Sequence, residues 1–262
     1  GLAKAAKKAG RIAAEGLVAV AVSEDAKEAA IVEVNSETDF VAKNDTFKAY
    51  VAEVADQALT TAAADIEGFL AEDSKAEAGK TVKEALDGKI AVIGENLNIR
   101  RFAKVSVADG FVASYIHAGG KIGVLVEVAT DVVNDEIKEM AKNVAMQIAA
   151  LNTPYLNESE VPAEIIEHEK EVMRQQVINE GKPEQIADKI VMGKIGKFYK
   201  ENCLLDQEFV KDNKINIKQY TQNTAKELGG SIEIKKFVRF EKGEGIEKRQ
   251  DDFAAEVASM VK

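Results

Sequence analysis

The sequence has few of the residues that build disulfide frameworks and metal centres. Its 262 residues include one cysteine, Cys203, and two histidines, His117 and His168. A single cysteine cannot form an internal disulfide, which suits a reducing compartment, so we expect a cytoplasmic protein. One cysteine and two separated histidines also lack the spacing of a zinc site. The composition therefore predicts no metal and no cofactor bound by this chain.

The sequence also lacks long apolar runs and an excess of positive charge. No stretch approaches the ~20 consecutive apolar residues that a membrane-spanning helix needs. Lys and Arg together number 35 against 45 Asp and Glu, which gives a formal net charge of −10. A negatively charged chain repels the phosphate backbone of DNA and RNA. We therefore expect neither a membrane partner nor direct nucleic-acid binding.

Sequence signatures of catalysis are scarce, so we expect a protein that is not an enzyme. The chain has no GxxxxGK[ST] phosphate-binding loop, and a tight turn between two strands explains Gly119 and Gly120. His117 has no nucleophile beside it in the sequence, which favours a structural or partner-contacting role. The alternative is an enzyme whose pocket combines His117 with carboxylates. That alternative requires a concave site around the two glycines rather than a hairpin tip.

An internal repeat is the most informative pattern in the sequence. Residues 110–128 (GFVASYIHAGGKIGVLVEV) align with residues 16–34 (GLVAVAVSEDAKEAAIVEV), and both read as strand, turn and strand ending in Val-Glu-Val. Each copy continues with a Thr-Asp pair, an Asn-Asp pair and a segment of helical apolar spacing. Residues 231–245 likewise match the strand that begins near Asn96. The sequence therefore predicts an α+β protein with two related lobes, each a small antiparallel three-stranded sheet packed by helices.

The second copy is interrupted by an insertion with two predicted helices. Ser159 and Pro162 mark the start of the first helix, Gly181 marks its end, and Pro183 opens the next. For this helical hairpin, a candidate coiled coil, three alternatives stay open: packing on its own lobe, docking on a partner, or forming a homodimer. The predicted divisions are a linker helix, 1–15; a first core lobe, 16–109; a second core lobe, 110–153 and 231–245; the inserted hairpin, 154–230; and a C-terminal helix, 246–262.

The segment from Val34 to Asp45, VNSETDFVAKND, joins a predicted buried strand to a predicted helix. Thr38 is suited to cap a short helical turn, and Asp39 suits the positive end of that turn. Asp45 is suited to cap the helix that follows. We expect the Phe40 side chain to pack inward. The alternative is an exposed aromatic anchor of the kind that dominates protein-binding hot spots.

EVNSETDFVAKND resembles the signature of the elongation factor Ts family. AKKAGRIAAEG, IGENLNIRR, YIHAGGKIGVLVEV and FVRFEKGEGIEK resemble further blocks in the family's order, so the resemblance covers essentially the whole chain. It implies a translation elongation factor that binds elongation factor Tu and acts as its guanine-nucleotide exchange factor. The family's doubled lobe and inserted helical hairpin agree with the pattern described above. Any magnesium ion or guanine nucleotide would belong to the partner.

The resemblance also implies roles for particular residues. The family's Thr-Asp-Phe loop contacts the nucleotide domain of elongation factor Tu, where its phenylalanine wedges between helices and disturbs the magnesium and phosphate site. The family's Ile-Gly pair and hairpin histidine approach the same domain, as does the C-terminal helix, which corresponds to 251–262 here. The matching positions of this sequence are Thr38, Asp39, Phe40, Ile93, Gly94 and His117.

One part of the family pattern is missing, and one rival interpretation stays open. The family begins with a compact helical module carrying a T-G-A-G-type motif, whereas this chain starts in the linker after it, as expected of a fragment. The rival is an RNA- or ribosome-associated binding protein without exchange activity. It requires a basic stripe with interleaved aromatic residues on a sheet face. The only indications of such a stripe are Arg100, Arg101 and Phe102 and the matching residues 235–237.

Overall fold

Two three-stranded antiparallel sheets form the centre of the molecule. The computed structural model describes residues 1–248, 257, 258, 260 and 261. The strand order is β1-β2-β3 in one sheet and β4-β5-β8 in the other. The strands are β1 (Glu15–Val22), β2 (Glu28–Ser36), β3 (Asn98–Ser106), β4 (Gly110–His117), β5 (Ile122–Thr130) and β8 (Ile232–Glu241). The predicted α+β class is confirmed.

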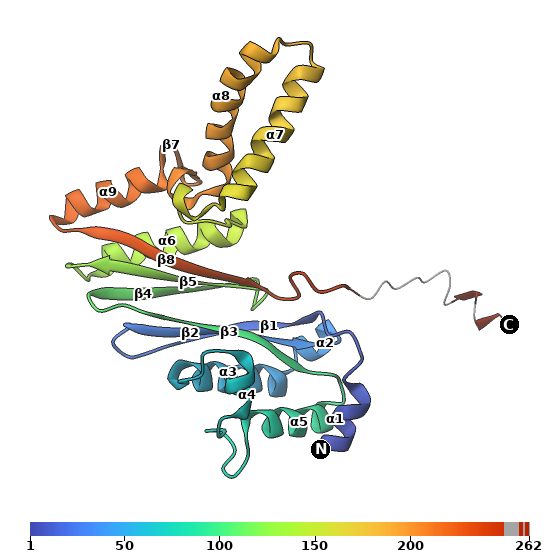
Figure 1. Ribbon diagram of the computed structural model, residues 1–262. Helices are drawn as coiled ribbons and strands as arrows, with labels where there is room; N and C mark the ends of the chain where they lie inside the picture. Colours follow the sequence, from blue (N-terminus) through green and yellow to red (C-terminus); the bar gives the residue numbers. More distant parts are fainter. Residues whose placement is uncertain (249–256, 259, 262) are drawn as a thin grey trace.

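Helices cover the outer face of each sheet, while the inner faces pack against each other. Figure 1 shows four layers, in which α3 and α5 lie outside the first sheet and α6 lies outside the second. In the described part of the chain, no helix is long and apolar enough to cross a membrane. The helices of the first lobe are α1 (Leu2–Lys8), α2 (Asp39–Ala42), α3 (Asp45–Thr60), α4 (Ile66–Ala71) and α5 (Val82–Ile93), and α6 (Asp135–Leu151) belongs to the second.

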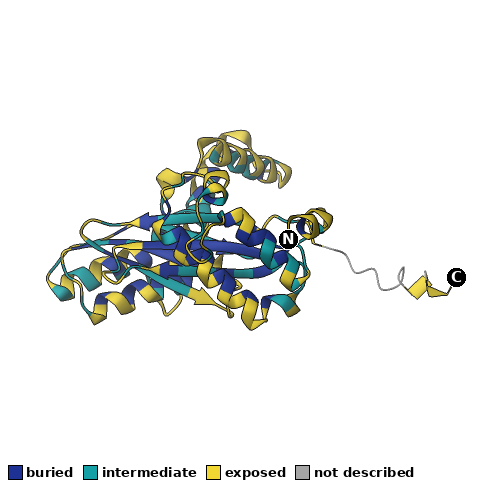
Figure 2. Ribbon diagram, turned by 90° about the horizontal axis from the view of Figure 1, so that it is seen from below, coloured by how far each residue is buried: buried dark blue, intermediate teal, exposed yellow. Residues whose placement is uncertain are grey.

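The central strands β2 and β5 are buried on both faces, which explains why their sequences are apolar at nearly every position. In β2, Val32 and Val34 contact the helix-covered core, whereas Ile31 contacts the second sheet. In β5, Val126 contacts the core under α6, whereas Leu125 contacts the first sheet. The alternation follows from the two-residue period of a strand. Figure 2 shows the buried residues concentrated along these strands and the inward helix faces.

The repeat in the sequence corresponds to a repeat in the backbone. The pairing of each central strand with the third strand of its sheet shifts register directly after the glutamate of Val-Glu-Val, at 33/34 and at 127/128, where β3 has the extra residue Arg100 and β8 has the extra residue Lys235. Gly16 and Gly110 occupy equivalent places in the outer strands, with φ of 121° and 137°. A Cβ atom at Gly16 would lie 2.1 Å from a backbone oxygen of β2, and one at Gly110 would lie 2.0 Å from a backbone oxygen of β5. Both positions therefore require glycine.

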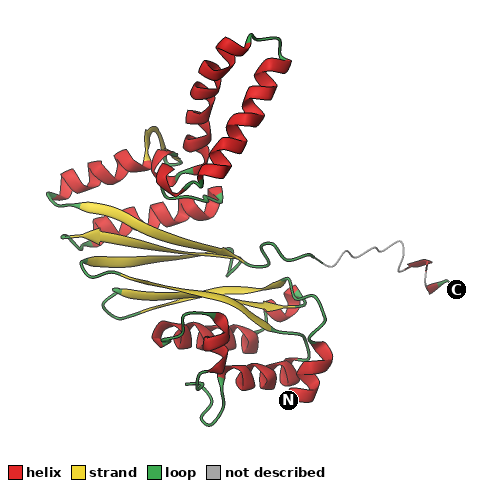
Figure 3. Cartoon of the chain, viewed as in Figure 1, coloured by secondary structure: helices red, strands yellow, loops and turns green. Residues whose placement is uncertain are grey.

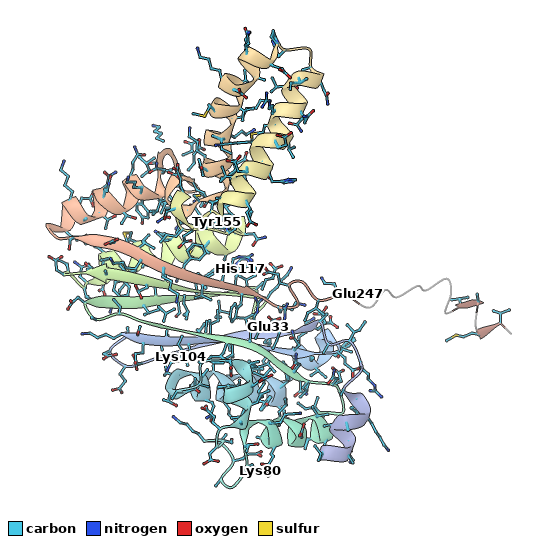
Figure 4. All side chains as sticks on the ribbon, viewed as in Figure 1. Glu33, Lys80, Lys104, His117, Tyr155 and Glu247 are labelled. Atoms are coloured by element: carbon cyan, nitrogen blue, oxygen red, sulfur yellow. The ribbon has the colours of Figure 1, made fainter. Side chains whose placement is uncertain are left out.

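The insertion in the second lobe contains more than the predicted helical hairpin. α7 (Ala163–Asn179) and α8 (Glu184–Asn202) project from the lobe and pack mainly against each other, so the alternative of packing on their own lobe is wrong (Figure 3). Tyr155 lies at the base of the hairpin (Figure 4), where its carbonyl accepts a hydrogen bond from the Leu204 amide at 2.8 Å. The unpredicted elements are β6 (Glu208–Phe209), β7 (Asp212–Asn216), α9 (Ile217–Leu228) and the short 3₁₀ helices Glu158–Glu160 and Leu204–Asp206.

A buried glutamate joins the two lobes. Glu33 of β2 is fully buried between the lobes (Figure 4), and its carboxylate accepts hydrogen bonds from Arg101 Nε at 2.6 Å and Arg100 Nη1 at 3.1 Å. The amide of Gly243, which follows β8 in the second lobe, donates to the same carboxylate at 2.6 Å. The Arg101 guanidinium also lies 4.2 Å from the centre of the Phe240 ring in β8. We call Glu33, Arg100, Arg101 and Gly243 the inter-lobe cluster.

Two local expectations differ from the structure, and a third falls largely on residues that the structure does not describe. The linker helix expected over residues 1–15 ends at Lys8, because Gly10 disfavours its continuation and residues from 15 onward join β1. The cap of α3 is Asn44 rather than Asp45, since the Asn44 side chain accepts the amide of Thr46 at 2.8 Å. The predicted C-terminal helix over 246–262 includes residues 249–256, 259 and 262, which lie outside the described residues.

Candidate partner-binding site

The Thr38–Phe40 loop leaves the end of central strand β2 and forms the start of α2. Thr38 has an extended backbone, with φ −120° and ψ 156°, and its hydroxyl accepts a hydrogen bond from the Val41 amide at 3.3 Å. The predicted cap is confirmed. Asp39 is the first helical residue, where the positive end of the helix favours its charge. Its carboxylate lies 3.9 Å from the Lys43 ammonium group, and both side chains are largely exposed.

The Phe40 side chain is exposed, so the expectation that it packs inward is wrong. Its exposed fraction is 82%. α2 is one helical turn, and its inward positions are taken by Ala42, which is buried, and Val41, which packs against the first-lobe core. An aromatic ring held in water forgoes the free energy of burial, roughly 1.5–3 kcal/mol for a large apolar side chain. The exposed ring is therefore available to a partner, as in the alternative of an exposed aromatic anchor.

The second lobe has no equivalent of this exposed loop. The next helix cap, Asn44, lies six positions after Thr38, whereas Asn134 lies four positions after Thr130, so the first copy has two more residues. No helix forms between Thr130 and α6, and the Asp131 carboxylate is held by the Ser231 amide at 2.8 Å. The two extra residues therefore give the first lobe a helical turn that the second lobe lacks.

The Thr38–Phe40 loop is held by the carboxylate of Glu95. The amides of Glu37 and Thr38 both donate to Glu95 Oε1 at 3.0 Å. The Thr38 hydroxyl donates to Glu95 Oε2 at 2.7 Å. In return, the Glu37 carboxylate accepts the amide of Asn96 at 2.8 Å and lies 3.6 Å from the Arg11 guanidinium. We call the bonds that Glu95 accepts from Glu37 and Thr38 the Glu95 brace.

Ile93 and Gly94 directly precede Glu95, and their geometry brings its carboxylate to the loop. Ile93 is the last residue of α5 and packs against the first-lobe core. Gly94 is exposed and has left-handed backbone angles, φ 88° and ψ 9°, which end the helix. The structure therefore brings the predicted Ile93-Gly94 pair close to the predicted Thr38–Phe40 loop. Glu95 was missed by sequence reasoning, and its place in the quoted IGEN block was the only available signal.

His117 lies at the same end of the stacked sheets as the loop. It is exposed at the end of β4, and the turn after it contacts the first lobe because the Gly120 carbonyl accepts the Val18 amide of β1 at 2.8 Å. The start of β1 pairs with Ser36, at the end of β2, from which the Thr38–Phe40 loop leaves. Figure 4 shows His117 toward this end of the molecule. The turn after β4 of the second lobe and the Thr38–Phe40 loop of the first therefore lie toward the same end of the stacked sheets.

A shallow recess of about 620 Å³ adjoins Phe40. Its walls combine apolar side chains with charges of both signs. The recess is lined by Arg11, Ile12, Ala14, Glu15, Glu37, Thr38, Asp39, Phe40 and Lys248.

The enzyme alternative depends on His117, and the RNA alternative depends on Arg100, Arg101, Phe102 and the matching residues 235–237. His117 lies at a hairpin tip rather than in a concave site, and its Nδ1 atom is 2.8 Å from the Tyr115 hydroxyl. The described residues contain no group of three or more His, Cys, Asp or Glu side chains placed to hold a metal ion. Arg100 and Arg101 belong to the inter-lobe cluster, and Phe102 stacks on Phe69 at 4.9 Å. Arg100, Arg101 and Phe102 therefore do not form a free basic stripe, whereas Lys235 and Lys236 of the matching segment are exposed and Lys235 lies 3.1 Å from the Glu233 carboxylate.

This fold and site define a two-lobed α+β protein in which an exposed aromatic residue, Phe40, lies on a braced helical turn. A family model described as Elongation factor TS matches residues 37–244, which include this turn, its brace and both sheets. The chain belongs to the elongation factor Ts family and is a translation elongation factor.

Similar proteins extend over the whole chain. It is 54% identical to elongation factor Ts of Clostridium botulinum (strain Alaska E43 / Type E3) over 261 residues, which is 100% of this chain and 86% of that protein. It is 53% identical to elongation factor Ts of Clostridioides difficile (strain 630) over 262 residues, with the same coverage. Elongation factor Ts of Clostridium perfringens (strain SM101 / Type A) is 52% identical over 260 residues, or 99% of this chain and 85% of that protein.

Proposed function

We propose that this chain is the guanine-nucleotide exchange factor for elongation factor Tu, and that Phe40 is the residue that opens the partner's nucleotide site. The observation that carries the proposal is the 82% exposure of Phe40 on a braced turn in a chain of this family. The phenylalanine enters between helices of the nucleotide domain and displaces the groups that hold magnesium and phosphate. GDP then leaves faster.

The physical basis is negative coupling between two ligands of one protein. The factor binds most tightly to the partner state whose nucleotide site is deformed, and that state holds GDP weakly. By linkage, rebound nucleotide weakens the factor by the same ratio, so GTP releases it. No bond in this chain is made or broken, and magnesium and nucleotide stay with the partner.

The other predicted residues support the same contact. Asp39 presents an exposed carboxylate beside Phe40, while Ile93 and Gly94 form the surface next to the loop. His117 adds a contact from the second lobe on the same side. We assign these residues to the interface with the nucleotide domain, together with the segment 251–262. A homodimer formed through the helical hairpin stays a prediction.

The test is the release of a fluorescent GDP analogue from elongation factor Tu, measured with this chain and with its Phe40→Ala variant. Val133→Ala is the matched control, because Val133 is a 53%-exposed apolar residue in the equivalent loop of the second lobe. We expect the intact chain and the control to accelerate release and Phe40→Ala to lose most of the acceleration. Equal rates for all three would contradict the role of Phe40. No acceleration by the intact chain would contradict the exchange function.

A further inference from the structure

The Thr38–Phe40 loop has little local structure to hold its shape. α2 contains four residues, and a single helical turn is unstable without outside contacts because helix nucleation is unfavourable. Asp39 and Phe40 are both exposed, so neither side chain anchors the turn through burial. An aromatic anchor on a mobile turn must be ordered when it binds, which costs affinity for the deformed partner state. Val41 and Ala42 anchor the far end of the turn in the first-lobe core, so the end that carries Thr38 to Phe40 needs contacts from elsewhere to fix it beforehand.

The Glu95 brace supplies those contacts from a distant part of the chain. Its three bonds join residues separated by 57 or 58 positions. Hydrogen bonds to an ionised acceptor are about twice as strong as neutral ones, and here two of the donors are backbone amides of the loop itself. The Thr38 hydroxyl that donates to Glu95 is the same group that caps α2 by accepting the Val41 amide. The brace therefore fixes both the position of the turn and its cap residue, Thr38.

We propose that Glu95 is a positioning residue for exchange: it does not touch the nucleotide site but holds Phe40 in the geometry that opens it. The inference rests on the proposed role of Phe40. It predicts that losing the Glu95 carboxylate reduces the maximal rate of GDP release while leaving the binding surface of the two lobes in place. Glu95 then acts only through the loop, so its effect depends on the presence of Phe40.

The variants follow from the geometry of the brace. Glu95→Ala removes all three bonds, whereas Glu95→Gln keeps one oxygen for the two amides and a donor for the Thr38 hydroxyl, which can turn to accept. Glu72→Ala is the matched control. The Glu72 carboxylate also accepts two side-chain hydrogen bonds in the first lobe, from Gln57 at 2.8 Å and Thr61 at 2.7 Å, but it lies at the other end of α3.

The experiment measures the maximal rate of GDP-analogue release at saturating chain, and the affinity of each variant for nucleotide-free elongation factor Tu. Glu95→Ala should lower the maximal rate about tenfold, the scale of one lost charge-assisted hydrogen bond, with a smaller change in affinity. Glu95→Gln should recover most of the rate, and Glu72→Ala should match the intact chain. The double variant Phe40→Ala/Glu95→Ala should be no slower than Phe40→Ala alone.

Hydrogen exchange of the free chain separates this inference from the function on which it rests. The amides of Glu37 and Thr38 should exchange faster in Glu95→Ala and in Thr38→Val than in the intact chain, and this readout needs no partner. Three results would overturn the role of Glu95. The first is unchanged hydrogen exchange at both amides in Glu95→Ala, and the second is a loss of release rate in Glu95→Ala no larger than that in Glu72→Ala. The third is that adding Glu95→Ala to Phe40→Ala lowers the release rate as much as Glu95→Ala does in the intact chain. A Phe40→Ala variant as active as the intact chain would instead overturn the role of Phe40.

Discussion

Phe40 is the only aromatic residue among the large apolar side chains that the described residues expose. Its neighbours Val41 and Ala42 take the inward positions of a single helical turn, so the ring has no place in the core. Local sequence favoured burial because an isolated phenylalanine between a strand and a helix usually packs inward. What decides its exposure is the three-dimensional position of α2 against the core, which is a non-local property.

Replacing Phe40 should separate function from stability. Phe40→Ala removes no buried contact, so we expect the free energy of unfolding to change by no more than about 0.5 kcal/mol, the usual range for surface substitutions. Urea denaturation followed by circular dichroism measures this change. A loss above about 2 kcal/mol would show that the ring packs in the core in solution.

Cys203 should be unreactive in the folded chain. The thiol is fully buried at the base of the helical hairpin, and burial raises its pKa to about 11, with the nearby Asp206 carboxylate adding to the shift. We expect little reaction with a disulfide reagent at pH 8 in the folded chain and rapid reaction after unfolding, because the thiolate is the reactive form. Rapid labelling of the folded chain would contradict this burial.

The same shift makes a contribution to stability that depends on pH. An unfolded thiol ionises near pH ~8.5, whereas the folded one keeps its proton to about pH 11. Between these two pKa values the folded state binds more protons than the unfolded state. The contribution of the Cys203 thiol to the free energy of unfolding is therefore complete below the unfolded pKa and is lost as pH rises through the folded pKa. Cys203→Ser should reduce this alkaline loss of stability.

At the scale of elements, α2 distinguishes the first copy of the repeat from the second. Deleting Ala42 and Lys43 gives the first lobe the same spacing as the Thr130–Asn134 segment of the second. We expect the deletion to remove the exposed turn and abolish stimulation of GDP release, because the sheet and α3 remain while the presentation of Phe40 is lost. Release kinetics and a thermal melt test this together. Full stimulation by the shortened chain would show that α2 is not needed.

The helical hairpin should be dispensable for folding of the lobes. α7 and α8 bury Val177, Ala187 and Val191 mainly against each other, and the chain ends of the hairpin meet beside Tyr155. Replacing residues 163–200 with a short glycine-serine linker should shift Tm by no more than ~4 °C, equivalent to about 1 kcal/mol at this chain length. Light scattering measures the molar mass of the intact chain and of the chain without the hairpin. A homodimer formed through the hairpin predicts the mass of a dimer for the intact chain and the mass of a monomer after the replacement.

The elements that sequence reasoning predicted are those with strong local signals. The repeated strand-turn-strand pattern indicated both sheets, and Pro162, Gly181 and Pro183 indicated α7 and α8. α9 was missed because KQYTQNTAKEL offers few apolar residues, and β6 and β7 are too short to show a period. The Glu95 brace and the face-to-face packing of the sheets join segments far apart in sequence, so no local pattern reports them.

At the scale of the whole molecule, the inter-lobe cluster sets how the two lobes meet. Glu33→Ala leaves Arg100 and Arg101 without their shared carboxylate at the contact between lobes. Breaking a buried ion pair on one side costs about 3–5 kcal/mol, and we expect a loss of that size in urea denaturation. Glu127→Ala, the half-buried counterpart in the second Val-Glu-Val, should cost less than about 1 kcal/mol. Equal losses would contradict the special position of Glu33.

The geometry of the whole molecule places the Thr38–Phe40 loop and His117 on the same side of two joined lobes. This arrangement allows one partner to contact both lobes at once, so the free energy of binding is available to deform the partner's nucleotide site. A factor that bound both states of the partner equally well would not shift the equilibrium between those states, however tightly it bound.

The central claim is therefore tested most directly by measuring the affinity of the chain for elongation factor Tu in its nucleotide-free and GDP-bound states. We predict binding to the nucleotide-free state that is tighter by about a hundredfold or more, the upper end of typical coupling energies, and a much smaller ratio for Phe40→Ala. Equal affinity of the intact chain for the two states, or a ratio that Phe40→Ala leaves unchanged, would contradict the account.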